Sequence, residues 1–238
     1  MGAAALTMRV ALLLSGVLLG APALAQAQRT PFQARCEDTL RKTSVQLTSS
    51  TPGYSIDNSV SYRALTQMKG RTARRAWVLG LTRAESHAAI RTSGSILEDR
   101  AAAYECMTPQ INVELSYVPI TVYVGREFGP GTCAYNQILQ HELRHVRSYL
   151  DHMAVVERTV RSALEQRFRS QPLYAPRGQS NALLGREIDA RWIPYIKSEL
   201  GKVEARQAAI DSPAEYARLS RICKGEVQSI LKAHRSTP

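Results

Sequence analysis

Five residues near the middle of the sequence have the types and spacing needed for metal-dependent hydrolysis: His141-Glu142-Leu143-Arg144-His145. On a helix, two histidines four positions apart lie on one face, so both imidazoles can reach one zinc ion at about 2.1 Å. Zinc would lower the pKa of a water molecule and polarise a peptide carbonyl, and Glu142 would take the proton of that water as the general base. This HExxH pattern therefore predicts a peptidase with one zinc ion per chain and no covalent intermediate.

The pattern requires a helix, and the surrounding sequence predicts one from Thr132, a typical N-cap residue, to about Arg169. Its apolar residues recur three and four positions apart, with one turn skipped at Glu157: Leu139, Leu143, Val146, Leu150, Met153, Val160 and Leu164. On a helical wheel His141 and His145 lie roughly opposite this stripe, so we expect one face to pack and the other to present ligands. The alternative is that both histidines are solvated on a charged helix surface.

A third zinc ligand is not evident close to the motif. Ser148 and Asp151 stand where the extended pattern HExxHxxGxxH would need Gly and His. Glu165 follows His145 by twenty residues, a spacing used by other zinc peptidases, but a continuous helix would carry it about 30 Å away. His152 lies about 10 Å along the axis from His145, too far to share one ion, and is interpreted as a surface residue.

A second helical stretch supplies candidates farther along the chain. It is expected from about Asn181 to Ile210, with an interruption at Pro194, after a connection rich in Pro and Gly over residues 171–179. If the two helices form an antiparallel hairpin, residues about thirty positions beyond the turn come back level with the histidines. Three acidic residues lie in or just beyond that zone: Glu204, Asp211 and Glu215. Asp211 precedes Ser-Pro and so could instead serve to end or cap a helix.

The residues before the motif predict a small sheet. Short extended segments are expected at residues 53–57 and 76–82, and a short helix from Ser59 to Lys69 that ends at Gly70. Apolar and polar residues alternate over 111–115 and again over 120–124, with Pro119 between them as a turn or an edge position. We therefore expect an α+β fold, with a small antiparallel or mixed sheet followed by the HExxH helix and an antiparallel helical partner.

The N-terminal residues 1–25 have the pattern of a secretory signal peptide: Arg9, an apolar run, and small residues before Gln26. Residues 26–238 should then form a single metallopeptidase domain outside the cytoplasm, periplasmic or extracellular, with no transmembrane segment. Four cysteines in an oxidising compartment predict two disulfides. Three pairings are possible, and we favour Cys106–Cys133 and Cys36–Cys223.

These features together resemble the predicted secreted bacterial zinc-dependent protease family, a zincin-like group. The resemblance covers roughly residues 54–216 and rests on Cys106, the strand pattern of residues 111–124, the HExxH motif, and the stretch Gln207-Ala208-Ala209-Ile210-Asp211. It implies a zinc endopeptidase acting on peptide or protein substrates. Because Asp211 falls both in this stretch and in the zone level with the histidines, we choose it as the third ligand beside His141 and His145.

Composition leaves two other functions open. The chain has 31 Lys and Arg against 20 Asp and Glu, a net charge of +11. This charge would suit a non-catalytic protein that binds an acidic cell-envelope surface. Cys133 at a helix start could instead be the nucleophile of a cysteine hydrolase. Nucleic-acid binding is disfavoured, because export removes that partner and the sequence contains no basic motif interleaved with aromatic residues.

Overall fold

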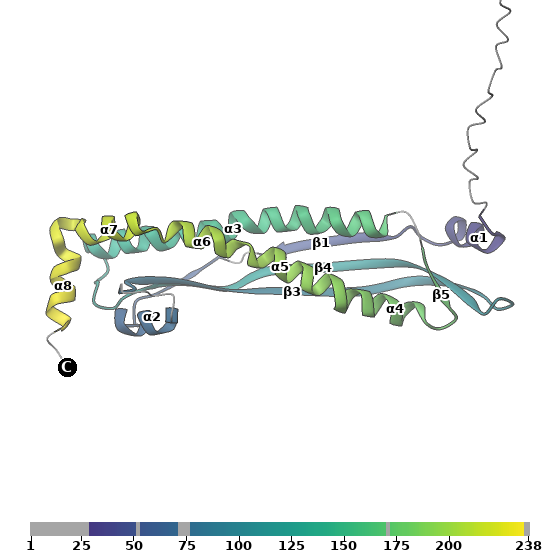
Figure 1. Cartoon of the computed structure of the whole chain (residues 1–238), viewed down its shortest axis with the longest axis horizontal. Helices are drawn as coiled ribbons and strands as arrows, with labels where there is room; N and C mark the ends of the chain where they lie inside the picture. The colour runs from purple at the N-terminus through teal and green to yellow at the C-terminus, as the bar shows by residue number, and fades with distance from the viewer. Residues whose placement is uncertain (1–28, 51–52, 71–76, 170–171, 236–238) are drawn as a thin grey trace, which may run out of the picture.

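The computed structural model describes residues 29–50, 53–70, 77–169 and 172–235, which form an elongated molecule with a sheet and a layer of helices (Figure 1). The predicted signal peptide lies outside the described residues. Within them, no helix is long and apolar enough to cross a membrane. The expected combination of a sheet and long helices is confirmed at this coarse level.

The sheet is built around β4 (Tyr104–Val124), which has neighbours along both edges. The long strand β3 (Gly80–Asp99) pairs antiparallel with β4 over its whole length. The other edge of β4 is taken in turn by β5 (Leu173–Pro176), β1 (Ser44–Ser50) and β2 (Ser55–Asp57); β1 and β2 are parallel to β4, and β5 is antiparallel. The sheet is therefore mixed, and β3 and β4 are much longer than the sequence pattern predicts.

Pro119 lies in the middle of β4, where Val118 and Pro119 together face the single residue Glu85 of β3. This bulge shifts the alternation of buried residues by one: Ile111, Val113, Leu115 and Tyr117 before it, and Ile120, Val122 and Val124 after it. Because side chains alternate with period 2, the extra residue keeps the apolar side chains of both halves on one face. The predicted turn at Pro119 was wrong, since one continuous strand contains it. On the edge of β4 away from β3, Pro119 lies between the residues that pair with β1 and those that pair with β2, so its lack of an N–H costs no ladder hydrogen bond.

The helices begin and end close to the predicted places. α2 (Tyr62–Lys69) is capped by Ser61 and ends at Gly70, whose φ is 65°. α3 (Cys133–Phe168) starts after Thr132, whose hydroxyl accepts from the backbone N–H of Tyr135 at 3.1 Å. The chain returns along α3 through α4 (Ser180–Glu187), a π-helical turn (Ile188–Trp192), α5 (Ile193–Gly201) and α6 (Val203–Ile210). The predicted antiparallel helical partner is thus present, with Pro194 in the first turn of α5.

Three further helices lie at the two ends of the molecule (Figure 1). α7 (Pro213–Arg221) and α8 (Glu226–Arg235) continue from α6 past the start of α3. α1 (Pro31–Thr39) lies at the opposite end. The described chain therefore travels the length of the molecule several times, and α8 lies near α2, where Arg63 donates to the backbone carbonyl of His234.

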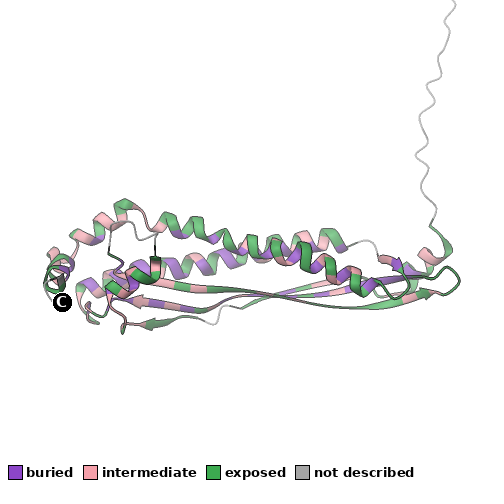
Figure 2. Ribbon diagram, turned by 60° about the horizontal axis from the view of Figure 1, so that its bottom comes forward, coloured by how far each residue is buried: buried purple, intermediate pink, exposed green. Residues whose placement is uncertain are grey.

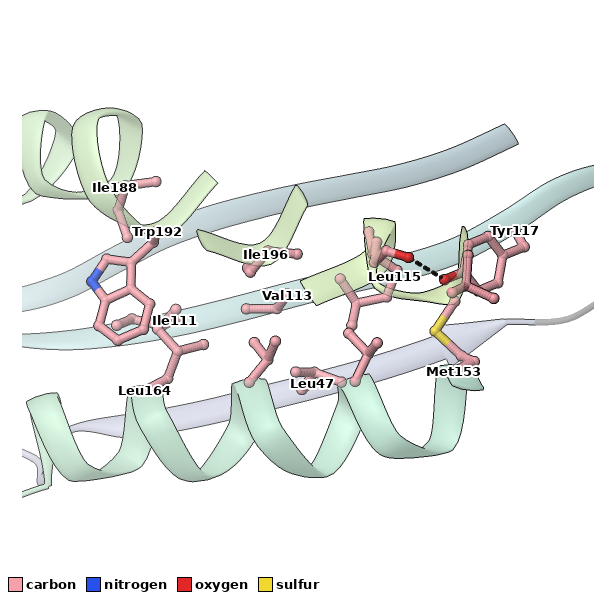
Figure 3. Packing of buried hydrophobic residues seen from close by; sticks show 14 of the residues in the cluster. Leu47, Ile111, Val113, Leu115, Tyr117, Met153, Leu164, Ile188, Trp192 and Ile196 are labelled. Atoms are coloured by element: carbon pink, nitrogen blue, oxygen red, sulfur yellow. Dashed lines mark hydrogen bonds between the residues drawn. The ribbon is translucent and has the colours of Figure 1, made fainter. Parts of the chain in front are cut away.

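The main core lies between the sheet, α3 and the returning helices. Figure 3 shows Val113 and Leu115 of β4 between Leu47 of β1 and Ile196 of α5, and the Tyr117 hydroxyl donates to the Leu200 carbonyl at 2.9 Å. Figure 2 shows buried residues concentrated between the layers and exposed residues on their outer surfaces. A second apolar cluster lies at the start of α3: Tyr62, Val124, Phe128, Ala134, Ile138, Val227 and Leu231.

The predicted packing face of α3 is confirmed in part, since Val146, Met153, Val160 and Leu164 belong to the main core, but the histidines do not lie on a separate, uncovered face. Leu150, assigned to the packing stripe, is 38% exposed, whereas His141 and His145 are 5% and 7% exposed. The reason is that α3 is covered by the sheet and also by the returning helices, so the histidines lie within the buried region. His152, interpreted as a surface residue, is also buried, and its Nε2 bonds to the Glu199 carbonyl at 2.9 Å.

All four cysteines form disulfides, as predicted, but the favoured pairing was wrong. Cys36 of α1 pairs with Cys106 of β4, and Cys133 at the start of α3 pairs with Cys223 between α7 and α8. The reason is topological. The β4 strand begins near α1 at one end of the molecule, while the returning helices bring Cys223 back to the start of α3 at the other.

Candidate metal centre

Three atoms able to bind a metal converge where α6 ends beside α3. The Nε2 atoms of His141 and His145 are 3.3 Å apart, and Oδ1 of Asp211 lies 3.1 Å from the first and 3.2 Å from the second. They form a nearly equilateral triangle. The three residues chosen from the sequence as zinc ligands therefore lie together, although they are separated by up to 70 positions along the chain.

The size of this triangle suits a zinc ion. Zinc held at about 2.0 to 2.1 Å in a tetrahedron places neighbouring ligand atoms about 3.3 to 3.4 Å apart. Two imidazole nitrogens and a carboxylate oxygen are also a donor set that zinc accepts. Such electron-pair donors repel one another at this separation unless a cation or a proton lies among them. The residues present therefore fit the metal that the HExxH pattern implies.

Local structure explains how these side chains reach one another. The histidines are one turn apart on α3, which puts their side chains on the same face. Asp211 ends α6, and its backbone N–H donates to the Gln207 carbonyl at 3.3 Å. Ser212 then caps α7 by accepting from the backbone N–H of Glu215 at 3.3 Å. The Asp-Ser-Pro sequence thus does end one helix and begin the next, and it also aims the Asp211 carboxylate at the histidines.

Gln207 and Glu215 orient the two imidazoles from behind. The Gln207 side-chain oxygen lies 2.5 Å from Nδ1 of His145, and its amide nitrogen donates to the His145 carbonyl at 3.3 Å. A side-chain carbonyl oxygen can only accept, so Nδ1 of His145 carries the proton and Nε2 keeps its lone pair for a metal. Nδ1 of His141 lies 3.2 Å from the Glu215 carboxylate and 2.8 Å from Nη2 of Arg144, which can only donate. Arg144 donates to Glu215.

Lys69 takes the second oxygen of Asp211. Its ammonium group donates to Oδ2, while Oδ1 faces the histidines. Burial would raise the pKa of Asp211, but its close contacts with His141 and His145 and the hydrogen bond from Lys69 outweigh burial and lower the pKa of this carboxyl group well below its ordinary value. The Asp211 carboxyl group is therefore ionised, with Oδ1 toward the histidines and Oδ2 toward Lys69.

Glu142 is buried beside the histidines, with 3% of its surface exposed. Burial raises the pKa of its carboxyl group above the ordinary value, although the nearby histidines oppose that rise. The hydroxyl of Thr82 in β3 donates to its Oε2 at 2.9 Å. Gly80, at the start of β3, lies so close that a Cβ there would be 2.7 Å from Glu142 Oε1.

These groups open into a cavity of about 700 Å³. Its walls come from α2, the start of β3, α3, α6, α7 and α8, and they include Lys69, Thr82, Tyr149 and Tyr216 besides the cluster itself. A cavity of this size is large enough for part of a peptide. The metal-binding atoms and the buried carboxyl group therefore share one space that a substrate could enter.

The other residues considered as ligands lie elsewhere. Glu204 lines the cavity without joining the cluster, and Glu215 contacts His141 from behind. Asp151 and Glu165 pair with Arg147 and Arg169 on the outer face of α3. The alternative of two solvated histidines is contradicted by their burial.

Three residues of the site were not identified from the sequence: Lys69, Gly80 and Thr82. The orienting role of Gln207 was not identified either. Only Gln207 gave a signal, through its place four residues before Asp211. The described part of the chain also brings Cys133 and Cys223 near Glu226. Both sulfur atoms are in a disulfide, so Cys133 has no thiol for a cysteine hydrolase.

Comparison with protein-family models, with curated proteins and with solved structures found no match to this chain.

Proposed function

We propose that this chain is an exported, zincin-like metallopeptidase that hydrolyses peptide bonds with one zinc ion. The observation that carries the proposal is the triangle of His141 Nε2, His145 Nε2 and Asp211 Oδ1, beside the buried carboxyl group of Glu142 and open to a cavity. A metal held by three protein atoms keeps a position for water or substrate, as catalytic zinc sites do.

When bound, zinc supplies a Lewis acid that polarises the carbonyl group and makes water more acidic. The protein's own groups do the rest. Glu142 accepts a proton from the attacking water and gives it to the leaving amine, and Thr82 holds this carboxyl group in place. Gln207 keeps the lone pair of His145 directed at the metal, and Lys69 keeps Asp211 turned toward it through one oxygen.

Export to the periplasm or beyond is the second part of the proposal. It is supported by the leader pattern of residues 1–25 and by the pairing of all four cysteines in disulfides, which persist in oxidising compartments. Expression with the native leader in a bacterial host tests it. N-terminal sequencing of the exported protein should find a start at or near Gln26, and retention of the uncut chain in the cytoplasm would contradict it.

The metal and the activity can be tested separately with Glu142→Gln. Elemental analysis of the purified mature protein should find one zinc per chain in both wild type and variant, because Glu142 is not one of the three converging ligands. Hydrolysis of a protein substrate should fall by about 100- to 10,000-fold in the variant, as expected when a general base is lost.

Glu165→Gln is the matched control, since it removes a carboxylate from the outer face of the same helix. It should leave zinc content and hydrolysis unchanged. Purified protein without stoichiometric zinc, or a Glu142→Gln variant as active as wild type, would contradict the proposed function. If the protein only bound an acidic envelope surface, neither Glu142→Gln nor Glu165→Gln would abolish its function.

A further inference from the structure

The second half of β3 is an open edge of the sheet. β3 pairs with β4 along one side, and the described residues place no strand along its other side (Figure 1). All six residues from Arg91 to Ile96 are exposed, so both faces of this segment are open to solvent. Directly across the ladder, Met107 and Ile111 of β4 are buried. Here the layer that buries β4 therefore does not reach β3.

An edge of this kind can pair with another strand, because its outward N–H and C=O groups have no partner in the sheet. Proteins usually prevent such pairing with a lysine, a proline or a bulge in the edge strand. Residues 91–99 contain neither lysine nor proline, and the bulge of the β3–β4 ladder lies farther back, at Glu85. We call residues 91–99 the β3 margin. Its Ile96 side chain is 39% exposed.

The β3 margin is complementary to itself. When two copies of one strand pair antiparallel about a two-fold axis, the residue on the axis faces its own copy, and residues equally far on either side of it face each other. With Ser95 on the axis, Arg91 of each copy faces Asp99 of the other. In the same register Gly94 faces Ile96, again twice. Directly opposed side chains lie on the same face, so opposite charges meet and the large Ile96 has space beside a glycine.

Neighbouring registers lose these matches. Moving the axis to Gly94 puts Arg91 opposite Leu97. Moving it to Ile96 puts Arg91 opposite Ala101, which lies beyond the end of the strand. Shifts by an odd number of residues would turn the sheets of the two copies to face opposite ways, because side chains alternate with period 2. The charge match and the match of large to small therefore select one register.

We propose that the β3 margins of two copies of this chain pair antiparallel about Ser95 and join the two sheets into one. The occupant is a second copy because both matches require the same sequence on the two sides. Arg91 already pairs with Glu114 of β4, and its five donors allow it to bond a second carboxylate. The paired margins contribute about eight to ten backbone hydrogen bonds.

The β3 margin lies far from the candidate metal centre. β3 begins at that centre with Gly80 and Thr82, and the margin is its other end (Figure 1). A strand rises about 3.3 Å per residue, so each Gly80 lies about 50 Å from Ser95 and the two are about 100 Å apart in the dimer. The dimer is therefore an extended molecule with one metal centre toward each end, and both cavities stay open.

Sedimentation equilibrium of the purified mature protein, from about 1 to 100 μM, tests the inference and should find twice the monomer mass. Ser95→Lys and Ser95→Glu each put two like charges on the axis and should weaken the dimer by about 5-fold or more. An equimolar mixture of these two variants should associate again, because lysine then faces glutamate. Ala89→Lys adds the same charge to an exposed position of β3 outside the margin and should change nothing.

A wild type that stays monomeric at about 100 μM overturns the inference and leaves a strand of another protein as the occupant of this edge. A dimer that persists unchanged in both Ser95 variants overturns it as well, as does a mixture of the two that fails to associate, or an equal loss in Ala89→Lys. None of these measurements depends on zinc or on cleavage. Failure of the dimer therefore leaves the proposed peptidase untouched, and an inactive protein still decides the dimer.

Discussion

Gly80 determines how closely β3 can approach the carboxyl group of Glu142. Any other residue would force neighbouring atoms to move, because a Cβ would lie within 2.8 Å of Ile138 and of two Glu142 atoms. We predict that Gly80→Ala displaces Glu142 and lowers kcat/KM by between about 10- and 100-fold, because small misplacements of catalytic groups are costly. Zinc content should stay at one per chain, since Gly80 touches none of the three ligands.

Gly185→Ala in α4 is the matched control, because nothing lies within 4 Å of its added methyl group. Alanine also favours a helix over glycine by about 1 kcal/mol. This control should therefore keep full activity and be as stable as wild type or slightly more so. If Gly80→Ala cleaves peptides at the wild-type rate, Glu142 does not need the close approach of β3.

The three converging residues could be predicted from sequence, but the residues that hold them in place could not. His141, Glu142 and His145 are contiguous on one helix, so their spacing alone predicts their relation. Asp211 required the assumption of a helical hairpin to bring it back to α3. Gly80, Thr82 and Lys69 come from β3 and α2, and nothing in their local sequence indicates a contact more than 50 positions away, as between Thr82 and Glu142.

The strands show the same limit. Local alternation predicted residues 111–115 and 120–124 correctly as strands, but Pro119 between them was predicted to be a turn or an edge position, and the bulge there was not predicted. Only the pairing of β4 with β3 shows this bulge, and that is a long-range interaction. Likewise, the prediction made from the apolar stripe of α3 assumed that only one face of this helix is covered. The helix is covered from two sides, so its buried surface includes the histidines.

Glu105 of β4 ties the sheet to α4 by a different kind of contact. Its carboxylate accepts from the backbone N–H groups of Gly178 and Ser180, both at 2.7 Å, at the N-terminus of that helix. Burial alone would raise its pKa, but the hydrogen bonds outweigh burial and lower the pKa. We predict that Glu105→Gln lowers the free energy of unfolding by about 1 to 2 kcal/mol at neutral pH.

The sign of this shift gives the pH dependence. A carboxyl group with a lowered pKa in the folded state stabilises the fold above its unfolded pKa and loses that contribution as pH falls through the folded pKa. Urea unfolding curves of wild type and Glu105→Gln should therefore differ at pH 7 and converge below about pH 4. Glu98→Gln, which removes a partly exposed partner of Arg177, should have little effect at either pH. If the difference in unfolding free energy between wild type and Glu105→Gln stays constant with pH, the ionised Glu105 carboxylate is not what stabilises the fold.

The two disulfides hold opposite ends of the elongated molecule. Cys133–Cys223 lies at the end that contains the candidate metal centre, and Cys36–Cys106 lies at the end where α1 meets β4 (Figure 1). We predict that replacing Cys133 and Cys223 together by Ala costs about 2 to 5 kcal/mol of stability. Hydrogen exchange should speed up most in α7 and α8, because they lose their covalent tie to α3.

The control is the double variant Cys36→Ala and Cys106→Ala, which removes the disulfide at the opposite end of the molecule. Its faster exchange should be confined to α1, the start of β4 and β5, while α8 keeps its wild-type protection. If both double variants accelerate exchange uniformly along the chain, the molecule opens as a single cooperative unit and the two ends are not independent.

The chain is synthesised from its N-terminus, so the residues of the candidate metal centre are made at different times. His141 and His145 emerge first, but Asp211 follows 66 positions after His145, and Cys223 and the α8 helix come later still. A nascent or truncated chain that stops before Asp211 therefore holds only two of the three converging groups. A peptidase built in this order would stay inert until Asp211, the last of the three groups, had been made and had folded against α3.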